Sequence, residues 1–294
     1  MTLRLLAVHA HPDDESSKGA GTLAYYRSRG ARVMVVSCTG GEEGRVLNDG
    51  LRAMAMADRD LPGLRRVEME SARAALDIEH RWLGYVDSGW PADGEPTPSN
   101  AFASVPLEIS AEPLVRIIRE LKPQVLVTYD ENGGYPHPDH IRAHEISIYA
   151  RDAAADSARY PDAGEAWKIE KTYYDRTFNS ARVNAIYNAL LEREPESPVA
   201  EQLGEMKRWF DRPDVSTTHV PVGDFFEIRD AALKAHESQV APDSNFFLWP
   251  NDLQREVWPW EDYELVNSSA EPELPESDLF AGISTTETPH EEPS

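Results

Sequence analysis

The feature that most limits the possible folds of this chain lies near its start. Two apolar runs stand there with a predicted helical segment between them. Residues 3–8 are apolar except for Arg4, which is typical of a central strand in a parallel sheet. We expect a helix over about residues 16–29, ended by Gly30, and a second buried strand over residues 32–38. A strand, a helix and a strand in this order predict a right-handed βαβ unit.

Strands and helices continue to alternate after this unit. We therefore predict an α/β fold, namely a Rossmann-like, mostly parallel β-sheet flanked by helices. Residues 87–106 are rich in Pro, Gly and Ser and predict a long loop. The other expected elements are a helix at 65–76, a strand at 82–86, a helix at 110–121, strands at 124–129 and 169–174, a long helix from near Asp139, and roughly two or three helices between residues 180 and 239.

The length of 294 residues suffices for one large domain with a buried core. We interpret residues 1–268 as a single domain, because the sequence contains no internal repeat and no evident linker. Residues 269–294 are acidic and Pro-rich, and we predict a partly disordered tail over roughly its last ten residues. Its apolar segment 279–283, LFAGI, is expected to pack back on the domain.

The net charge of −23 argues against two classes of partner. An acidic surface repels phosphate backbones and anionic membranes, so we expect no nucleic acid and no membrane as partner. The sequence has neither an apolar run of about 18 residues nor a signal-peptide pattern. Cys38 is the single cysteine, which excludes an intrachain disulfide and leaves His and carboxylate side chains as metal ligands. We expect a cytoplasmic protein, and a homo-oligomer is compatible with the sequence.

Two polar motifs each follow a predicted strand. The first is HAHPDDE at residues 9–15 and the second is HPDH at residues 137–140. The carboxyl ends of parallel strands face one crevice, so we expect both motifs at one site. Two histidines and a carboxylate with an open fourth position form a common catalytic zinc set. Structural roles stay open from spacing alone, because Asp13 and Asp14 could cap a helix and each histidine could simply be hydrogen-bonded.

The motif HAHPDDES together with HPDH resembles the LmbE-like N-acetylglucosaminyl deacetylase family, also called the PIG-L superfamily. The similar stretches VSCTGGEEG, WLGYVDSG and TYDENGGYPHPDHIRAH extend the resemblance over nearly the whole chain. The resemblance implies that residues 1–268 form an LmbE-like zinc hydrolase domain. It implies one Zn2+ per subunit, held by His11, Asp14 and His140 at the carboxyl ends of the strands. These ligands would also accept Fe2+.

The same resemblance implies roles for the neighbouring residues. Asp13 corresponds to the general base, and His137 to a group that stabilises the developing oxyanion, which we interpret as an imidazolium. Tyr135 corresponds to a mobile tyrosine near the metal. Arg45 stands where relatives often have Glu. The residues implied to bind substrate are Lys18, on the acyl-cysteine side, and Arg65 and Asp87, on the sugar-inositol side.

The implied activity is hydrolysis of the amide bond of mycothiol S-conjugates, a small-molecule substrate. The products would be a mercapturic acid, which is an N-acetylcysteine conjugate, and glucosaminyl-inositol, and the role would be mycothiol-dependent detoxification. Lys18 after HPDDESS favours this activity within the family. The alternatives are deacetylation of N-acetylglucosaminyl-inositol in mycothiol biosynthesis, a related hydrolase of antibiotic biosynthesis, and a non-catalytic Rossmann-type nucleotide-binding module. The last is disfavoured because no G-x-G-x-x-G follows the first strand.

Overall fold

The structure is a computed structural model that describes residues 2–92, 95–207 and 213–283. Its described residues form one mixed sheet with the strand order β3-β2-β1-β4-β5-β7-β6. The strands from β1 to β5 run parallel, whereas β7 pairs antiparallel with both β5 and β6. The strands are β1 (Arg4–His9), β2 (Arg32–Thr39), β3 (Glu79–Tyr85), β4 (Val125–Thr128), β5 (Lys171–Asp175), β6 (Thr218–Pro221) and β7 (Trp260–Ser268).

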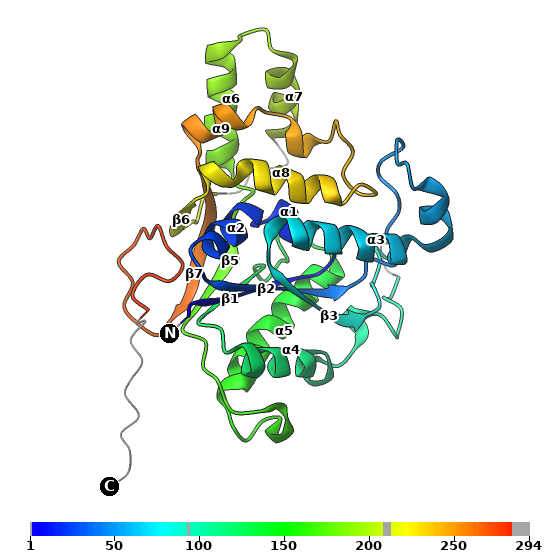
Figure 1. The fold of residues 1–294 in the computed structure, drawn as a ribbon, viewed down its shortest axis with the longest axis vertical. Helices are drawn as coiled ribbons and strands as arrows, with labels where there is room; N and C mark the ends of the chain where they lie inside the picture. The colour runs from blue at the N-terminus through cyan, green and yellow to red at the C-terminus, as the bar shows by residue number, and fades with distance from the viewer. Residues whose placement is uncertain (1, 93–94, 208–212, 284–294) are drawn as a thin grey trace.

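Helices cover both faces of the sheet (Figure 1). One face carries α2 (Ala20–Ser28), α3 (Met54–Leu76) and α8 (Phe226–Ala235), and the other carries α4 (Leu107–Leu121) and α5 (Pro138–Ala155). The prediction of an α/β fold with a mostly parallel sheet is confirmed. The remaining helices are the short α1 (Asp14–Ser17) and a group away from the sheet, formed by α6 (Ser180–Arg193), α7 (Pro198–Met206) and α9 (Asn251–Val257).

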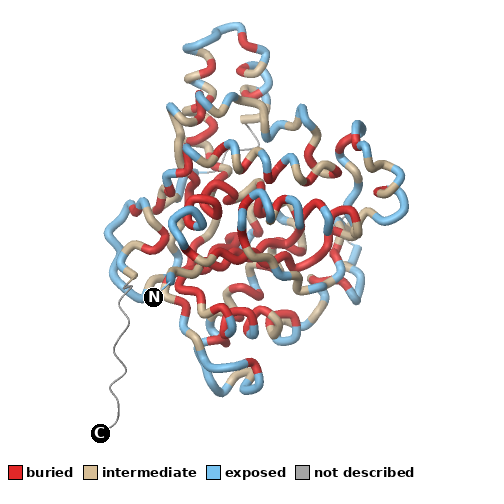
Figure 2. Tube along the Cα trace, viewed as in Figure 1, coloured by how far each residue is buried: buried red, intermediate tan, exposed pale blue. Residues whose placement is uncertain are grey.

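The alternation of side chains along β1 divides the core into two layers. Leu5 and Ala7 pack on the side of α2, α3 and α8, whereas Leu6 and Val8 pack on the side of α4 and α5. All four are essentially inaccessible to solvent. Figure 2 shows that the centre of the molecule is buried throughout. Because both faces are covered, the strand is apolar almost throughout, which explains the apolar run in the sequence.

The order in which strands are added to the sheet changes direction at β1. From β1 the chain moves outward through β2 to β3, and it then returns to the other side of β1 as β4 and continues to β5. Such a switch point opens a crevice at the carboxyl ends of the two central strands. The segment after β1 and the segment after β4 both enter this crevice, and these segments carry the two polar motifs.

The expected helix over residues 16–29 is two helices, α1 and α2, interrupted at Lys18 and Gly19. Gly19 has a φ of +142°, which no helix allows, and a Cβ at this position would lie 3.1 Å from the hydroxyl of Tyr263. The interruption therefore needs glycine, and it lets α1 turn towards the crevice while α2 packs on the sheet.

Strands β6 and β7 are absent from the sequence predictions. In β7 the buried charged residues Glu261 and Asp262 interrupt the apolar pattern. Glu261 accepts hydrogen bonds from the backbone of Gly21 and Thr22, so it caps the start of α2. Asp262 is fully buried and accepts from the indole of Trp258 at 2.9 Å. Adjacent charged residues are typical of a loop in the sequence, even when they are buried and hydrogen-bonded in the fold.

The described part of the C-terminal tail packs against the domain. Leu279 and Phe280 of the LFAGI segment are buried beside Tyr26, as the apolar character of the segment predicts. Glu276 pairs with Lys171 of β5 at 2.5 Å and accepts from the hydroxyl of Tyr173 at 2.8 Å. The predicted disorder of the last residues falls on positions outside the described part.

No helix within the described ranges combines the length and the apolar character that a membrane crossing requires.

The buried pair between Lys171 and Glu276 predicts a large effect of Lys171→Met. Both side chains are only 3% exposed, so the substitution leaves a buried carboxylate without its counter-charge. We expect the free energy of unfolding, measured by urea denaturation, to fall by about 3 kcal/mol. The matched control is Lys122→Met, because its partner Glu165 is 85% exposed and the change should stay below about 1 kcal/mol. Equal losses in the two variants would contradict the assignment of the pair.

Candidate metal centre and active site

Tyr129, directly after β4, joins the two polar motifs. Its hydroxyl accepts from the backbone nitrogen of Ala10 at 2.9 Å and lies 3.3 Å from Nδ1 of His9. Its ring stacks on the ring of His140, with centroids 4.4 Å apart and an angle of 19° between the planes. One buried side chain therefore sets the turn after β1 against the start of α5.

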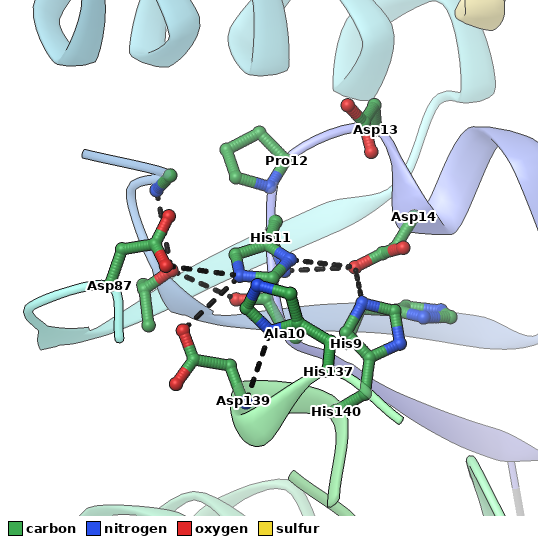
Figure 3. Close-up of polar contacts among 12 residues, drawn as sticks. His9, Ala10, His11, Pro12, Asp13, Asp14, Asp87, His137, Asp139 and His140 are labelled. Carbon is green, nitrogen blue, oxygen red and sulfur yellow. Dashed lines mark hydrogen bonds and ion pairs between the residues drawn. The ribbon is translucent and has the colours of Figure 1, made fainter. Parts of the chain in front are cut away.

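The side chains of His11, Asp14 and His140 converge in the crevice (Figure 3). Oδ2 of Asp14 lies 3.6 Å from Nδ1 of His11 and 3.4 Å from Nε2 of His140. The same oxygen accepts from the backbone nitrogen of His11 at 3.0 Å, which holds the carboxylate in place. The three candidate ligand atoms all lie within 4.8 Å of one another, as atoms that share one ion do.

His140 presents a nitrogen that suits a metal. Its Nδ1 lies 2.9 Å from the carbonyl oxygen of Gly133, to which it donates, so the proton sits on Nδ1 and Nε2 carries a lone pair. Nε2 is buried and has no hydrogen-bond partner among the described residues. Burial lowers the pKa of His140 to about 3, which keeps the ring neutral. A buried lone pair without a donor, facing a carboxylate, fits a cation.

A second set of candidate ligands, His11, His137 and Asp139, shares His11 with the first. The carboxylate of Asp139 already accepts from the backbone nitrogen of Ser88 at 2.9 Å and from the hydroxyl of Ser88. Nε2 of His11 lies 3.2 Å from the same carboxylate and donates to it. Asp139 thus resembles the carboxylate that orients a metal-bound histidine, and Nδ1 of His11 is left for the ion.

The electrostatics of this cluster also call for positive charge. Burial opposes protonation of His11, but its hydrogen bonds to Asp139, Asp14 and Asp87 outweigh burial and raise its pKa well above the usual value. Oδ1 of Asp87 lies 3.6 Å from Nε2 of His11. A divalent cation between His11 and Asp14 would meet the same demand.

Asp13 lies beside this cluster without belonging to it (Figure 3). Its φ of +98° is a left-handed conformation that turns the chain from β1 into α1. Arg65 secures the turn by donating to the carbonyl of Pro12 at 2.7 Å and to Asp13 at 3.2 Å. Burial raises the pKa of Asp13 and Asp14 adds to this effect, whereas the charge of Arg65 opposes it. A carboxylate with a raised pKa beside a metal site suits proton transfer.

The guanidinium of Arg65 is buried and hydrogen-bonded to the protein. It also fills the space that a side chain at position 41 would need. It donates to the carbonyl of Gly41 at 3.1 Å, and a Cβ on Gly41 would lie 1.9 Å from Nη1. The structure thus places Arg65 as a support for Asp13. Its predicted contact with the sugar-inositol part of a substrate stays a prediction, as does that of Asp87.

Glu15 and His236 form a buried pair that the sequence predictions missed. Nε2 of His236 lies 2.7 Å from Oε1 of Glu15, and both side chains are fully buried. The other oxygen of Glu15 accepts from the backbone nitrogen of Asp13 at 3.0 Å. Burial alone would raise the pKa of Glu15, but His236 outweighs it and holds that pKa at about 2. The pair connects the end of α8 to the turn that carries the candidate ligands.

His137 caps the N-terminus of α5, and this role favours a neutral ring over the imidazolium expected from the sequence. Its Nδ1 accepts a hydrogen bond from the backbone nitrogen of Asp139 at 3.1 Å, so Nδ1 carries no proton. Burial and the charge of His11 both lower its pKa. The neutral ring therefore carries its proton on Nε2, which leaves one N–H donor for an oxyanion.

Lys18 and Tyr135 flank the candidate ligands. Nζ of Lys18 lies 2.5 Å from Oδ1 of Asp14, the oxygen turned away from the histidines, and 5.9 Å from the centre of the Tyr135 ring. Tyr135 is 39% exposed and stacks parallel to Trp90, which is 63% exposed. The sequence predictions did not include Trp90, because the loop around it carries no periodic pattern.

Two hollows meet at this site. The Lys18 hollow is bordered by Lys18, Tyr135, Asp175, Leu233, Val240 and Phe246, among others. It spans about 1150 Å³ and the Trp90 hollow about 900 Å³, in both cases with the adjoining open solvent included. The Trp90 hollow is bordered by Trp90, Asp87, Arg65, His11 and His137. Residues that line both are Asp13, Asp14, Leu47, Tyr135 and Gln239. An extended ligand could therefore cross the candidate metal centre from one hollow to the other.

The fold and the donor set define an α/β protein with a candidate three-ligand metal centre at the carboxyl edge of a mostly parallel sheet. Residues 6–151 match the PIG-L family model, described as GlcNAc-PI de-N-acetylase. The chain is 51% identical to the mycothiol S-conjugate amidase of Streptomyces coelicolor, over 96% of this chain and 97% of that protein. The chain therefore belongs to the PIG-L family, whose similar members are deacetylase and amidase hydrolases.

A second relative has a different activity. The 1D-myo-inositol 2-acetamido-2-deoxy-alpha-D-glucopyranoside deacetylase of Geodermatophilus obscurus is 42% identical, over 95% of this chain and 98% of that protein. Among solved structures, the N,N'-diacetylchitobiose deacetylase of Pyrococcus horikoshii is similar, with a TM-score of 0.60 and 18% identity over 90% of this chain and 84% of that one. At this identity the structural likeness shows a shared fold.

Zinc titration of two histidine variants will discriminate between the two candidate ligand sets. We expect His140→Ala to lose zinc, because Nε2 of His140 belongs to the set with Asp14, whereas the matched variant His144→Ala should retain it. His144 lies one turn further along α5 and contacts the carbonyl of Tyr129. Asp139→Asn should weaken zinc binding by about 10–100-fold, as loss of an orienting carboxylate does. Full zinc occupancy in His140→Ala would refute the ligand assignment.

Proposed function

We propose that this protein is a zinc-dependent amidase that hydrolyses the amide bond of mycothiol S-conjugates. The products would be a mercapturic acid and glucosaminyl-inositol, in mycothiol-dependent detoxification. The observation that carries the proposal is that the two hollows meet at Asp14, one of the three candidate ligands, and His11 borders one of them, which suits an amide with a large group on either side. The relative with 51% identity, a mycothiol S-conjugate amidase, supports the same substrate class.

The chemistry requires a nucleophile, a charge acceptor and a proton for the leaving amine. Zinc, when bound, would supply a Lewis acid that activates water and polarises the amide carbonyl. Asp13 would accept the proton of the attacking water as the C–O bond forms, and it would pass a proton to the amine as the C–N bond breaks. The hydrogen bond from Arg65 would hold its carboxylate in position for both transfers.

His137 would stabilise the oxyanion as a neutral donor. The backbone nitrogen of Asp139 occupies Nδ1 of His137, so Nε2–H is the group available to the tetrahedral oxygen. Tyr135 borders both hollows and would approach the same oxygen after a movement of its exposed side chain. Both residues would therefore act on the carbonyl, opposite the proton transfers assigned to Asp13.

The sugar-inositol part would occupy the Trp90 hollow. Asp87 and Arg65 border this hollow, and the exposed rings of Trp90 and Tyr135 offer apolar faces to a sugar. Arg45, which stands where relatives often have Glu, also lines it, and would alter the contacts with the sugar. We retain a cytoplasmic location as part of the proposal, and a homo-oligomer stays compatible with it.

The nearest alternative is deacetylation of N-acetylglucosaminyl-inositol, which the 42% identical relative favours. The two reactions share the amine product and differ in the acyl group, so the same donor set serves both. A nucleotide-binding module is disfavoured, because HPDDE replaces the glycine-rich turn after β1 and its carboxylates would repel phosphates.

Rates on two substrates will separate the amidase from the deacetylase. We expect the zinc-loaded protein to hydrolyse a bimane conjugate of mycothiol with a kcat/KM at least about tenfold above that for N-acetylglucosaminyl-inositol. Both products contain the same free amine, so one amine assay measures both reactions. A higher kcat/KM for the acetylated substrate would assign the protein to the deacetylases instead.

Asp13→Asn will test the general base. Asparagine tolerates the left-handed backbone at this position, so the turn should remain while the proton acceptor is lost. We expect kcat to fall by about 10²–10⁴-fold with zinc content unchanged, both measured on one preparation. A rate near that of the unaltered protein would remove Asp13 from this role.

A further inference from the structure

The Lys18 hollow draws its lining from several distant parts of the chain, including Leu47 in the loop after β2 and Pro213 before β6. Lys18 follows α1, Tyr135 precedes α5, Asp175 ends β5, and a last group comes from α8 and the segment after it. This last group supplies three apolar side chains, which are Leu233, Val240 and Phe246.

Several polar side chains of this lining are already bonded within the protein, although the buried hydroxyl of Thr177 has no hydrogen-bond partner among the described residues. Lys18 pairs with Asp14, and Arg176 pairs with Asp130 and Glu264. Asp175 accepts from the backbone nitrogen of Thr177 at 2.8 Å, and the amide of Asn179 donates to Asp262 at 2.9 Å and accepts from the backbone of Arg182. A ligand gains little by competing for groups that have partners.

The apolar side chains of the lining, by contrast, still have surface to bury. Phe246 is 38% exposed and Leu47 is 57% exposed, beside the buried Leu233 and Val240. Exposed apolar surface in a concave site is what an apolar group of a ligand covers. The Trp90 hollow shares Leu47 and has the exposed ring of Trp90, but it lacks the apolar group of Leu233, Val240 and Phe246. Asp87, Glu43 and Arg45 line it instead and favour a polyol.

We propose that the Lys18 hollow binds the thioether substituent on the acyl side of the substrate, with a preference for an apolar aromatic or alkyl group against Phe246. The proposal rests on the proposed amidase function, since it gives the two hollows opposite ends of one substrate. It makes the apolar wall from residues 233–246 the part of the site that distinguishes a thioether acyl group from acetyl.

Binding of the acyl product tests this assignment without turnover. The probes are S-benzyl-N-acetylcysteine and S-methyl-N-acetylcysteine, which share the carboxylate and differ in the apolar group, titrated calorimetrically into zinc-loaded protein. We expect the benzyl compound to bind with a Kd at least about tenfold lower. This ratio should fall to about one in Phe246→Ala and in Phe246→Asp, because both remove the apolar contact.

Phe247→Ala is the matched control, since Phe247 lies in the same turn and contacts Lys234 without lining the hollow. The benzyl preference should persist in this variant. Equal binding of the two probes to the unaltered protein, or an unchanged preference in Phe246→Ala, would overturn the assignment. If the amidase assay fails but the benzyl preference is present, the proposed function alone is rejected. If the amidase assay succeeds but the benzyl preference is absent, only the assignment of the Lys18 hollow is rejected.

Discussion

The site depends on a cluster of buried carboxylates held around one imidazole. Asp14, Asp87 and Asp139 all lie within 3.6 Å of nitrogens of His11, and burial of such charges is costly unless they are paired. Lys18 pairs with one oxygen of Asp14, and Ser88 satisfies Asp139. A divalent cation would balance these carboxylates, so the residues that are costly to bury together would make metal binding favourable.

The geometry of this cluster is maintained from a distance. Asp13 adopts a left-handed backbone conformation. Arg65 of α3 donates hydrogen bonds to the carboxylate of Asp13 and to the carbonyl oxygen of Pro12. The backbone nitrogen of Asp13 is held by Glu15, which His236 at the end of α8 pairs with in turn. The two helices α3 and α8 also pack against each other on one face of the sheet (Figure 1). The helix layer formed by α3 and α8 thus supports the turn that carries the candidate ligands. Buried hydrogen bonds offset the backbone strain of this turn.

Features encoded by local pattern were predictable from the sequence, and features that depend on distant pairing were not. The apolar runs of β1, β2 and β4 and the polar motifs at the ends of β1 and β4 correctly predict a sheet with the motifs at one edge. Strand β7 escaped prediction because the buried Glu261 and Asp262 accept hydrogen bonds from residues far away in the chain, namely Gly21 and Asn179. His236 gave no signal either, since its partner Glu15 lies 221 residues away.

The candidate metal site and the apolar lining of the Lys18 hollow come largely from different segments of the chain. The candidate ligands, Asp13 and His137 all fall within residues 6–151, the part that matches the family model. Leu233, Val240 and Phe246 of the Lys18 hollow lie beyond that part, whereas Leu47 lies within it. The donor set is bound to its geometry by buried charges, so it tolerates little change, whereas a wall of apolar side chains can vary in size without disturbing them. Under the proposed assignment of the Lys18 hollow, substitutions at Leu233, Val240 and Phe246 are expected to change the preferred acyl group without disturbing the donor set.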